Sequence, residues 1–138
     1  MRRAAILVAV ALVGGCGGSA EQDRSDAHVI RTWVDLVSAS RYVEAASFFA
    51  PGAIVDQGEP IRLRDREAAE RFNRGLPCRA DLIDTEDEGK TTLASFRLRR
   101  GPGGPCNGIV RVRFTIRDQK FVRFIQLPGG GAPPGVEA

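Results

Sequence analysis

Apolar residues recur at helical spacing in the first half of the chain and predict three helices. The first begins after Asp26, a residue suited to cap a helix, and its buried stripe comprises Val29, Ile30, Trp33, Val34 and Val37. A second, shorter helix begins at Ser40, ends at the Pro-Gly pair of 51–52, and carries Tyr42, Val43, Ala46 and Phe49. The third follows Asp65, stops at Pro77, and presents an apolar face of Ala68, Ala69, Phe72 and Leu76.

Apolar and polar residues alternate with period two in the second half of the chain, which predicts a run of strands. Two short strands, 53–57 and 61–63, precede the third helix, and longer strands follow it at 78–86, 91–99, 106–117 and 120–127. Asp118 and Gln119 form a tight turn between the last two strands. One face of these strands is apolar and the other carries Arg97, Arg99, Arg111, Arg113, Arg117 and Arg123. Helices followed by an antiparallel meander indicate an α+β fold with the helices packed on one face of the sheet.

The first 15 residues have the features of an export signal. Arg2 and Arg3 precede a run of apolar residues and a stretch of small residues that ends at Cys16. The apolar run is too short to cross a bilayer, which takes about 20 residues. The sequence VGGC at 13–16 resembles a bacterial lipobox, which implies cleavage before Cys16 and attachment of lipid to that residue. The alternative is an ordinary secreted protein with a chance cysteine at this position.

After removal of the signal, the remaining chain is predicted to consist of three segments. We expect a lipidated cysteine and tether over 16–25, a folded domain over 26–127, and a disordered tail over 128–138, where Gly and Pro are abundant. The predicted location is the extracytoplasmic face of the cell membrane, with the lipid as anchor. Loss of Arg2 and Arg3 lowers the formal charge from +3 to +1, so bulk charge gives no reason to expect nucleic-acid binding.

The cysteine and histidine content limits the available chemistry. With Cys16 assigned to the lipid, Cys78 and Cys106 remain as a pair in an oxidising compartment. We expect a disulfide between them that stabilises the fold by about 3.6 kcal/mol, with two free thiols as the alternative. One His and three Cys are too few for a usual four-ligand zinc site, and no glycine motif for a nucleotide is present. The sequence therefore predicts neither a metal nor a cofactor.

One stretch of the chain resembles a known superfamily. Its residues are RYVEAASFFAPGAIV at 41–55, and they are similar to the second helix and first strand of the nuclear transport factor 2-like superfamily, in particular its SnoaL-like bacterial members. The resemblance extends over 26–127. It implies a cystatin-like cone, in which a curved antiparallel sheet wraps around three N-terminal helices and leaves an apolar pocket at the open end. Such folds host isomerases, cyclases, dehydratases, hydrolases and binding modules, so the resemblance does not define an activity.

The resemblance also implies which positions face the pocket. In ketosteroid isomerases of the superfamily, a tyrosine on the first helix donates to a developing oxyanion, and an aspartate at the end of the first strand moves the proton. These positions fall on Trp33 and Gln57 here, and an amide does not accept a proton near neutral pH, so the isomerase mechanism does not carry over. We expect ligand contacts from Trp33, Tyr42, Gln57, Phe72, Phe96 and Phe114, with the Tyr42 hydroxyl at the rim.

Two functions follow from these observations. The first is a membrane-tethered, non-catalytic module that binds a small apolar ligand or an envelope protein through the pocket or the sheet. The second is a SnoaL-like isomerase, cyclase or dehydratase that uses pocket carboxylates, for which Asp56 and Asp84 are the candidates. Strand alternation points Asp56 away from Gln57, whereas Asp84 and Gln126 face the pocket if their strands are phased without interruption. His28 is expected to face solvent.

The arginine-rich sheet face has a structural interpretation, in one of two forms, and a functional one. It is either a solvated face paired with acidic residues such as Asp81 on the neighbouring strand, or a homodimer surface. A functional alternative is contact with anionic lipid headgroups or an acidic partner.

Overall fold

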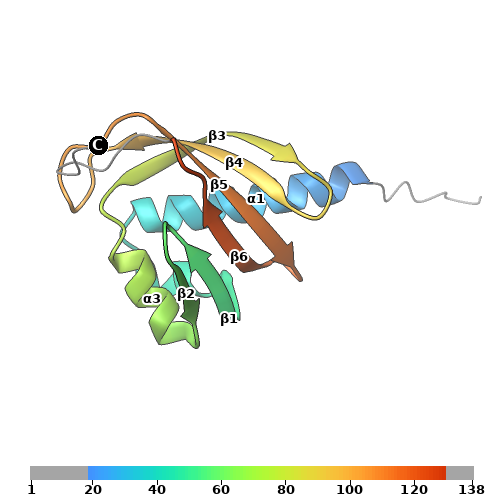
Figure 1. The fold of residues 1–138 in the computed structure, drawn as a ribbon, viewed down its shortest axis with the longest axis horizontal. Coiled ribbons are helices and arrows are strands. Elements are labelled where there is room, and N and C mark those ends of the chain that lie inside the picture. Colours follow the sequence, from blue (N-terminus) through green and yellow to red (C-terminus); the bar gives the residue numbers. More distant parts are fainter. Residues whose placement is uncertain (1–18, 130–138) are drawn as a thin grey trace, which may run out of the picture.

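The computed structural model describes residues 19–129, which form one six-stranded mixed sheet and three helices (Figure 1). The helices are α1 (Ser19–Ser38), α2 (Tyr42–Ala46) and α3 (Arg66–Arg74). The strands are β1 (Phe49–Asp56), β2 (Pro60–Leu63), β3 (Arg79–Asp87), β4 (Thr92–Arg99), β5 (Ile109–Arg117) and β6 (Lys120–Gln126). The α+β class predicted from the sequence is confirmed. The signal segment, Cys16 and residues 130–138 of the predicted tail lie outside the described residues.

The sheet has the strand order β2-β1-β6-β5-β4-β3 and curves around α1 (Figure 1). Neighbouring strands are antiparallel, except that β6 runs parallel to β1. The predicted antiparallel sheet therefore contains one parallel pair, because the last strand of the meander returns beside the first strand of the chain. Register shifts in β1, in β3 and in the β5–β6 pair mark bulges, which bend the strands and increase their twist.

Helix α1 begins at Ser19, well before the predicted start. Asp26 therefore lies inside the helix instead of capping it, and its Oδ2 accepts a hydrogen bond from Thr92 Oγ1 on β4 at 3.4 Å. The helix includes residues 19–25, predicted as part of the tether, where Ala, Glu, Gln and Arg favour helix. The predicted apolar stripe is buried throughout, since no member is more than 6% exposed: Val29, Ile30, Trp33, Val34 and Val37. Among the described residues, no helix is long and apolar enough to span a membrane.

The second helix is shorter than predicted and the first strand is longer. Helix α2 ends at Ala46, and β1 begins at Phe49, which was expected on the helix. The Pro-Gly pair of 51–52 lies within β1, at the bulge, where a missing N–H and the positive φ of Gly52 (79°) are tolerated. Phe49 is consequently a buried strand residue, whereas Val43, expected on an apolar helix face, is 55% exposed.

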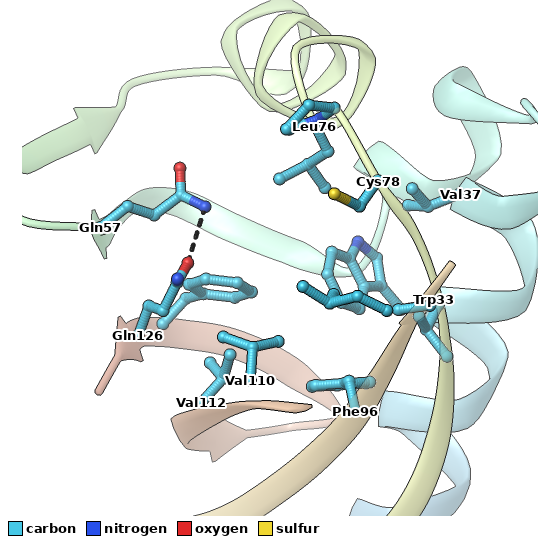
Figure 2. A pocket seen from close by; sticks show the side chains of 14 residues that line it. Trp33, Val37, Gln57, Leu76, Cys78, Phe96, Val110, Val112 and Gln126 are labelled. Atoms are coloured by element: carbon cyan, nitrogen blue, oxygen red, sulfur yellow. Dashed lines mark hydrogen bonds between the residues drawn. The ribbon is translucent and has the colours of Figure 1, made fainter. Parts of the chain in front are cut away.

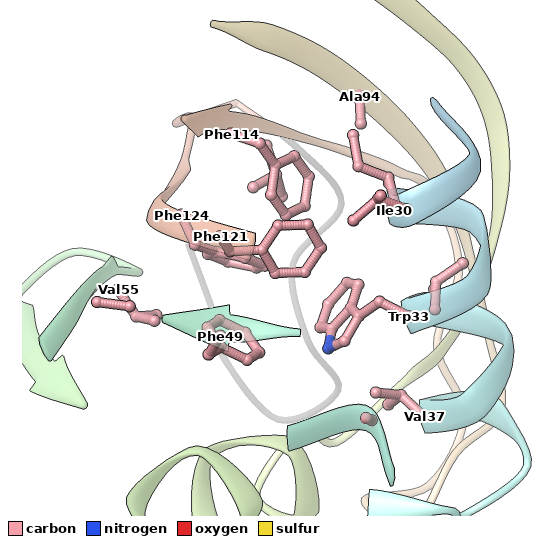
Figure 3. Packing of buried hydrophobic residues seen from close by; sticks show 14 of the residues in the cluster. Ile30, Trp33, Val37, Phe49, Val55, Ala94, Phe114, Phe121 and Phe124 are labelled. Atoms are coloured by element: carbon pink, nitrogen blue, oxygen red, sulfur yellow. The ribbon is translucent and has the colours of Figure 1, made fainter. Parts of the chain in front are cut away.

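The core is an aromatic cluster centred on Trp33, which projects from α1 towards the concave face of the sheet (Figure 3). Five phenylalanine rings lie edge-on to the indole, with ring centroids 5.6 to 6.4 Å away: Phe49, Phe96, Phe114, Phe121 and Phe124. Edge-to-face pairs of this kind stabilise a fold by about 0.5–1.5 kcal/mol beyond the burial of their area. The cluster fixes α1 against strands from both halves of the sheet and leaves Trp33 in a defined orientation.

Candidate functional site

An apolar pocket with a volume of about 100 Å³ lies between α1, the connection from α3 to β3, and the concave side of β4, β5 and β6 (Figure 2). Its walls are formed by Trp33, Val34, Val37, Gln57, Leu76, Pro77, Cys78, Ala80, Phe96, Leu98, Val110, Val112, Phe124 and Gln126. Of the described residues that line it, none has a side chain that gains or loses a proton near neutral pH, since Cys78 is in a disulfide. Polar atoms are supplied by Trp33 and the two glutamines.

The indole N–H of Trp33 is already engaged by a protein group. Trp33 Nε1 donates to Asn73 Oδ1 at 3.1 Å, and Asn73 Nδ2 donates to the Tyr42 backbone oxygen at 3.4 Å. Asn73 is fully buried on α3, so its amide joins α1, α2 and α3 in the interior. Sequence reasoning missed this residue, although it lies one helical turn after the buried Ala69. Trp33 therefore presents its ring to the pocket, while its N–H serves a structural contact.

We predict that Asn73→Leu lowers the free energy of unfolding by about 1–3 kcal/mol, because it leaves the buried Trp33 N–H without an acceptor. Trp33→Phe removes that donor, so the loss caused by Asn73→Leu should be smaller in the Trp33→Phe background. Urea denaturation of the two single variants and the double variant measures this coupling. Fully additive losses would show that the hydrogen bond contributes nothing.

The two glutamines come together through the parallel pairing of β1 and β6. Asp56 is in register with Ile125, so the next residues, Gln57 and Gln126, lie side by side at the same end of the sheet. Gln57 Nε2 donates to Gln126 Oε1 at 3.1 Å (Figure 2). Figure 2 shows the two amides across the cavity from Trp33. The end of β1 at the pocket thus carries one member of an uncharged amide pair.

The structure places three of the six predicted ligand-contacting residues in the pocket wall: Trp33, Gln57 and Phe96. The other three, Tyr42, Phe72 and Phe114, are not among its described lining residues. Phe114 is fully buried in the aromatic cluster. The ring of Phe72 fills the space between Phe49 and Phe124. The Tyr42 ring lies beneath the Arg74 guanidinium at 5.1 Å, because α2 and α3 pack together away from the pocket.

Neither candidate carboxylate reaches the pocket. Asp56 belongs to the opposite face of β1 from Gln57, as alternation predicts, and its Oδ1 accepts from the Gly58 N–H at 2.9 Å.

Asp84 was expected to share a face with Leu82, but the bulge between them shifts the phase of β3 by one residue. Leu82 is in register with Phe96 on the pocket side, whereas Asp84 is in register with Ser95 on the outer side. Gln126 faces the pocket, and His28 is exposed.

The predicted disulfide between Cys78 and Cys106 is confirmed, and it forms part of the pocket wall. It joins the segment before β3 to the loop between β4 and β5, and Gly103 N donates to the Pro77 oxygen at 2.9 Å across the same junction. Gly101 lies so close to this segment that an added Cβ would come within 2.6 Å of Arg79 N and Pro77 O. The disulfide and the loop thus hold one side of the pocket.

The arginine-rich face lies on the side of the sheet opposite the pocket and is partly neutralised. Arg99 Nε donates to both Asp81 oxygens at 3.1 Å, and Arg113 donates to Glu88 at 2.8 and 3.2 Å. The hydrogen bonds from Arg113 lower the pKa of the Glu88 carboxyl, and the carboxylate raises the pKa of Arg113. The expected pairing of arginine with Asp81 is therefore present.

Within residues 19–129, no three His, Cys, Asp or Glu side chains gather where they could hold a metal ion.

Comparisons with known proteins define the fold. No protein-family model and no curated protein matches the sequence. Among solved structures, a nuclear transport factor 2-like protein of unknown function from Burkholderia xenovorans aligns with a TM-score of 0.61 and 17% identity, over 88% of this chain and 91% of that chain. A candidate ketosteroid isomerase from Kribbella flavida gives 0.60 and 20%, over 85% and 91%. The chain has the nuclear transport factor 2-like fold.

The fold implied by the resemblance of residues 41–55 is therefore confirmed. A candidate polyketide cyclase from Sinorhizobium meliloti shares this nuclear transport factor 2-like fold, with a TM-score of 0.57 and 22% identity over 72% of this chain and 94% of that chain. The structural neighbours thus include cyclase and isomerase candidates beside a protein of unknown function. Because one fold hosts many activities, the chemistry has to be inferred from the pocket of this chain.

Proposed function

We propose that this protein is a non-catalytic binding module that takes a small, uncharged, apolar ligand into the pocket beside Trp33. The observation that carries the proposal is the absence of any ionisable side chain among the described residues of the pocket wall. General acid–base catalysis needs a group that exchanges a proton within hydrogen-bond reach of the substrate. Apolar walls with a few convergent polar groups are typical of sites that bind small molecules.

The alternative is a SnoaL-like isomerase, cyclase or dehydratase, and the candidate activities of two structural neighbours favour it. Such a reaction requires a base in the pocket of this chain. The resemblance of residues 41–55 assigns the position of the isomerase base to Gln57, an amide, and Asp56 and Asp84 belong to the other face of the sheet. The Trp33 N–H is engaged by Asn73 and is not free to stabilise an oxyanion. The geometry therefore favours binding without proton transfer.

The binding proposal is tested with toluene as a one-ring apolar probe. Trp33 is the only tryptophan of the chain and lines the pocket, so its fluorescence, excited where toluene does not absorb, reports occupancy. Toluene should change the emission in a saturable way. Ala80→Leu, which adds apolar atoms inside the cavity, should weaken this binding at least tenfold.

Ala39→Leu makes the same change at an exposed position and should leave toluene binding intact. Unsaturable quenching, or equal binding by the Ala80→Leu and Ala39→Leu variants, would overturn the pocket as the binding site. Turnover of a steroid-like or polyketide-like ketone that is lost on Asp56→Asn would instead establish the enzyme alternative.

We also propose that the module is held on the extracytoplasmic face of the cell membrane through lipid on Cys16. This proposal is supported by the charged start, the short apolar run and the VGGC sequence at 13–16. Mass spectrometry of the protein isolated from its native membrane should find Cys16 as a lipidated N-terminus. A native protein that retains Met1 and an unmodified Cys16 would refute the anchor, and it would leave the pocket proposal unaffected.

A further inference from the structure

The Gln57–Gln126 amide pair is the polar feature that a ligand in the pocket would meet. Among the side chains of the described lining residues, the other nitrogen or oxygen atom is Trp33 Nε1, which already donates to Asn73. A primary amide has two N–H donors and an oxygen with two lone pairs. One hydrogen bond joins the two glutamines, so the pair keeps both unused N–H groups and unused oxygen lone pairs. It can donate to a ligand or accept from it.

We infer that this amide pair selects the chemical class of the ligand: a neutral molecule whose hydroxyl, carbonyl or amide group binds Gln57 and Gln126 while its apolar end enters the cavity. The inference rests on the proposed binding function. It adds that the ligand is uncharged, that it carries a polar group, and that this group lies at Gln57 and Gln126. It also assigns Gln57 and Gln126 as the residues that determine specificity.

The charges around the pair favour a neutral ligand over an anion or a cation. Gln57 is exposed and Gln126 is half-buried, so the pair stands at the rim of the pocket. No cationic side chain is among the described residues of the pocket wall, so a carboxylate at this rim would lose part of its hydration without a counter-charge. Gln57 also borders a neighbouring crevice lined by Glu59, whose negative charge opposes an anion further. A cation would lack a carboxylate inside the pocket itself. Amide groups lose less hydration than ions when they are buried, and the glutamines replace those hydrogen bonds.

The volume of the cavity limits the apolar end of the ligand. Pockets for drug-sized molecules have volumes of about 300–1,000 Å³, whereas this cavity has about 100 Å³. An apolar cavity of about 150 Å³ in another protein takes up benzene. The apolar end of the ligand is therefore limited to one ring at most, or a short branched chain, beside Trp33 and Phe96, and the polar group of the molecule remains at the glutamines (Figure 2).

The experiment compares probes that share one ring and differ in the polar group: toluene, benzamide, benzoate and benzylammonium. Their dissociation constants are measured from Trp33 fluorescence with the full chain, and protein NMR confirms that the probes share one site. In the wild-type protein, benzamide should bind at least tenfold more tightly than benzoate. In the Gln57→Leu/Gln126→Leu double variant, benzamide should bind about tenfold more weakly, while toluene binds as before or more tightly.

Two further variants make the outcome decisive. Asn107→Leu removes an exposed amide that does not line the pocket, and it should leave all four constants unchanged. Gln57→Glu places a carboxylate at the pocket and should transfer the preference to benzylammonium. If toluene binds but benzamide is neither preferred over benzoate nor weakened in the double variant, the role of the amide pair is overturned and the binding function stands. If no probe binds the wild-type protein, the proposed function itself fails.

Discussion

Phe114→Ala is expected to lower the free energy of unfolding by about 3–5 kcal/mol, because it removes a large ring from the centre of the core. Phe114 is fully buried, and its ring centroid lies 4.7 Å from that of Phe121, 5.2 Å from that of Phe124 and 6.1 Å from that of Trp33. The surrounding rings come from α1, β4 and β6 and cannot all move into the cavity that the substitution leaves. Urea denaturation followed by circular dichroism measures the loss.

Phe48→Ala is the matched control for this prediction. Phe48 is half-buried, and among the described rings it pairs only with Phe121, at 6.3 Å in a tilted arrangement, so the expected loss is below about 2 kcal/mol. If Phe114→Ala does not fold, Phe114→Leu retains part of the volume and should unfold at a lower urea concentration than wild type. Equal losses for the Phe48 and Phe114 variants would contradict the central position of Phe114.

Replacement of Cys78 and Cys106 by alanine is expected to lower the free energy of unfolding by about 3.6 kcal/mol on the chain-entropy estimate. The disulfide closes a loop between residues 28 positions apart and so restricts the unfolded chain. In the folded protein it also holds the segment before β3 against the β4–β5 loop, where Gly101 and Gly103 approach Pro77 closely. Toluene binding should weaken as well, since Cys78 lines the pocket.

A reducing agent provides the control for the disulfide. In dithiothreitol, the wild-type protein should have the same free energy of unfolding as the double alanine variant. The same agent should leave the variant itself unchanged, because no disulfide remains to be reduced in it. If reduction does not alter the stability of the wild-type protein, the disulfide is absent or contributes nothing to folding.

Short-range patterns were sufficient to predict many elements of the fold. The apolar stripe of α1 follows from helical spacing, and Asp65 caps α3 as predicted, with Oδ1 accepting from the Ala68 N–H at 2.8 Å. The turn at Asp118 and Gln119 takes φ angles of 51° and 61°, which suit a two-residue hairpin. These features depend on residues a few positions apart, so the sequence alone contains the information.

The candidate site was predicted less completely, because it depends on strand phase and on contacts between distant segments. Simple alternation along β3 places Asp84 on the pocket side, and one bulged residue reverses that result. Asn73 has the ordinary appearance of a polar helix residue, yet it accepts from an indole N–H 40 positions away. Phe72 and Phe114 are aromatic and apolar, as pocket residues often are, and their location in the core follows only from the rings around them.

The sequence by itself determined the α+β class, the apolar stripe of the first helix and the pairing of Cys78 with Cys106. Only the tertiary structure decided that Gln57 meets Gln126, that the Trp33 N–H is engaged by Asn73, and that no described carboxylate lines the pocket. The physical reason is that periodicity and capping depend on residues only a few positions apart in the sequence. Bulges and the parallel β1–β6 pair arise when the whole sheet closes around α1.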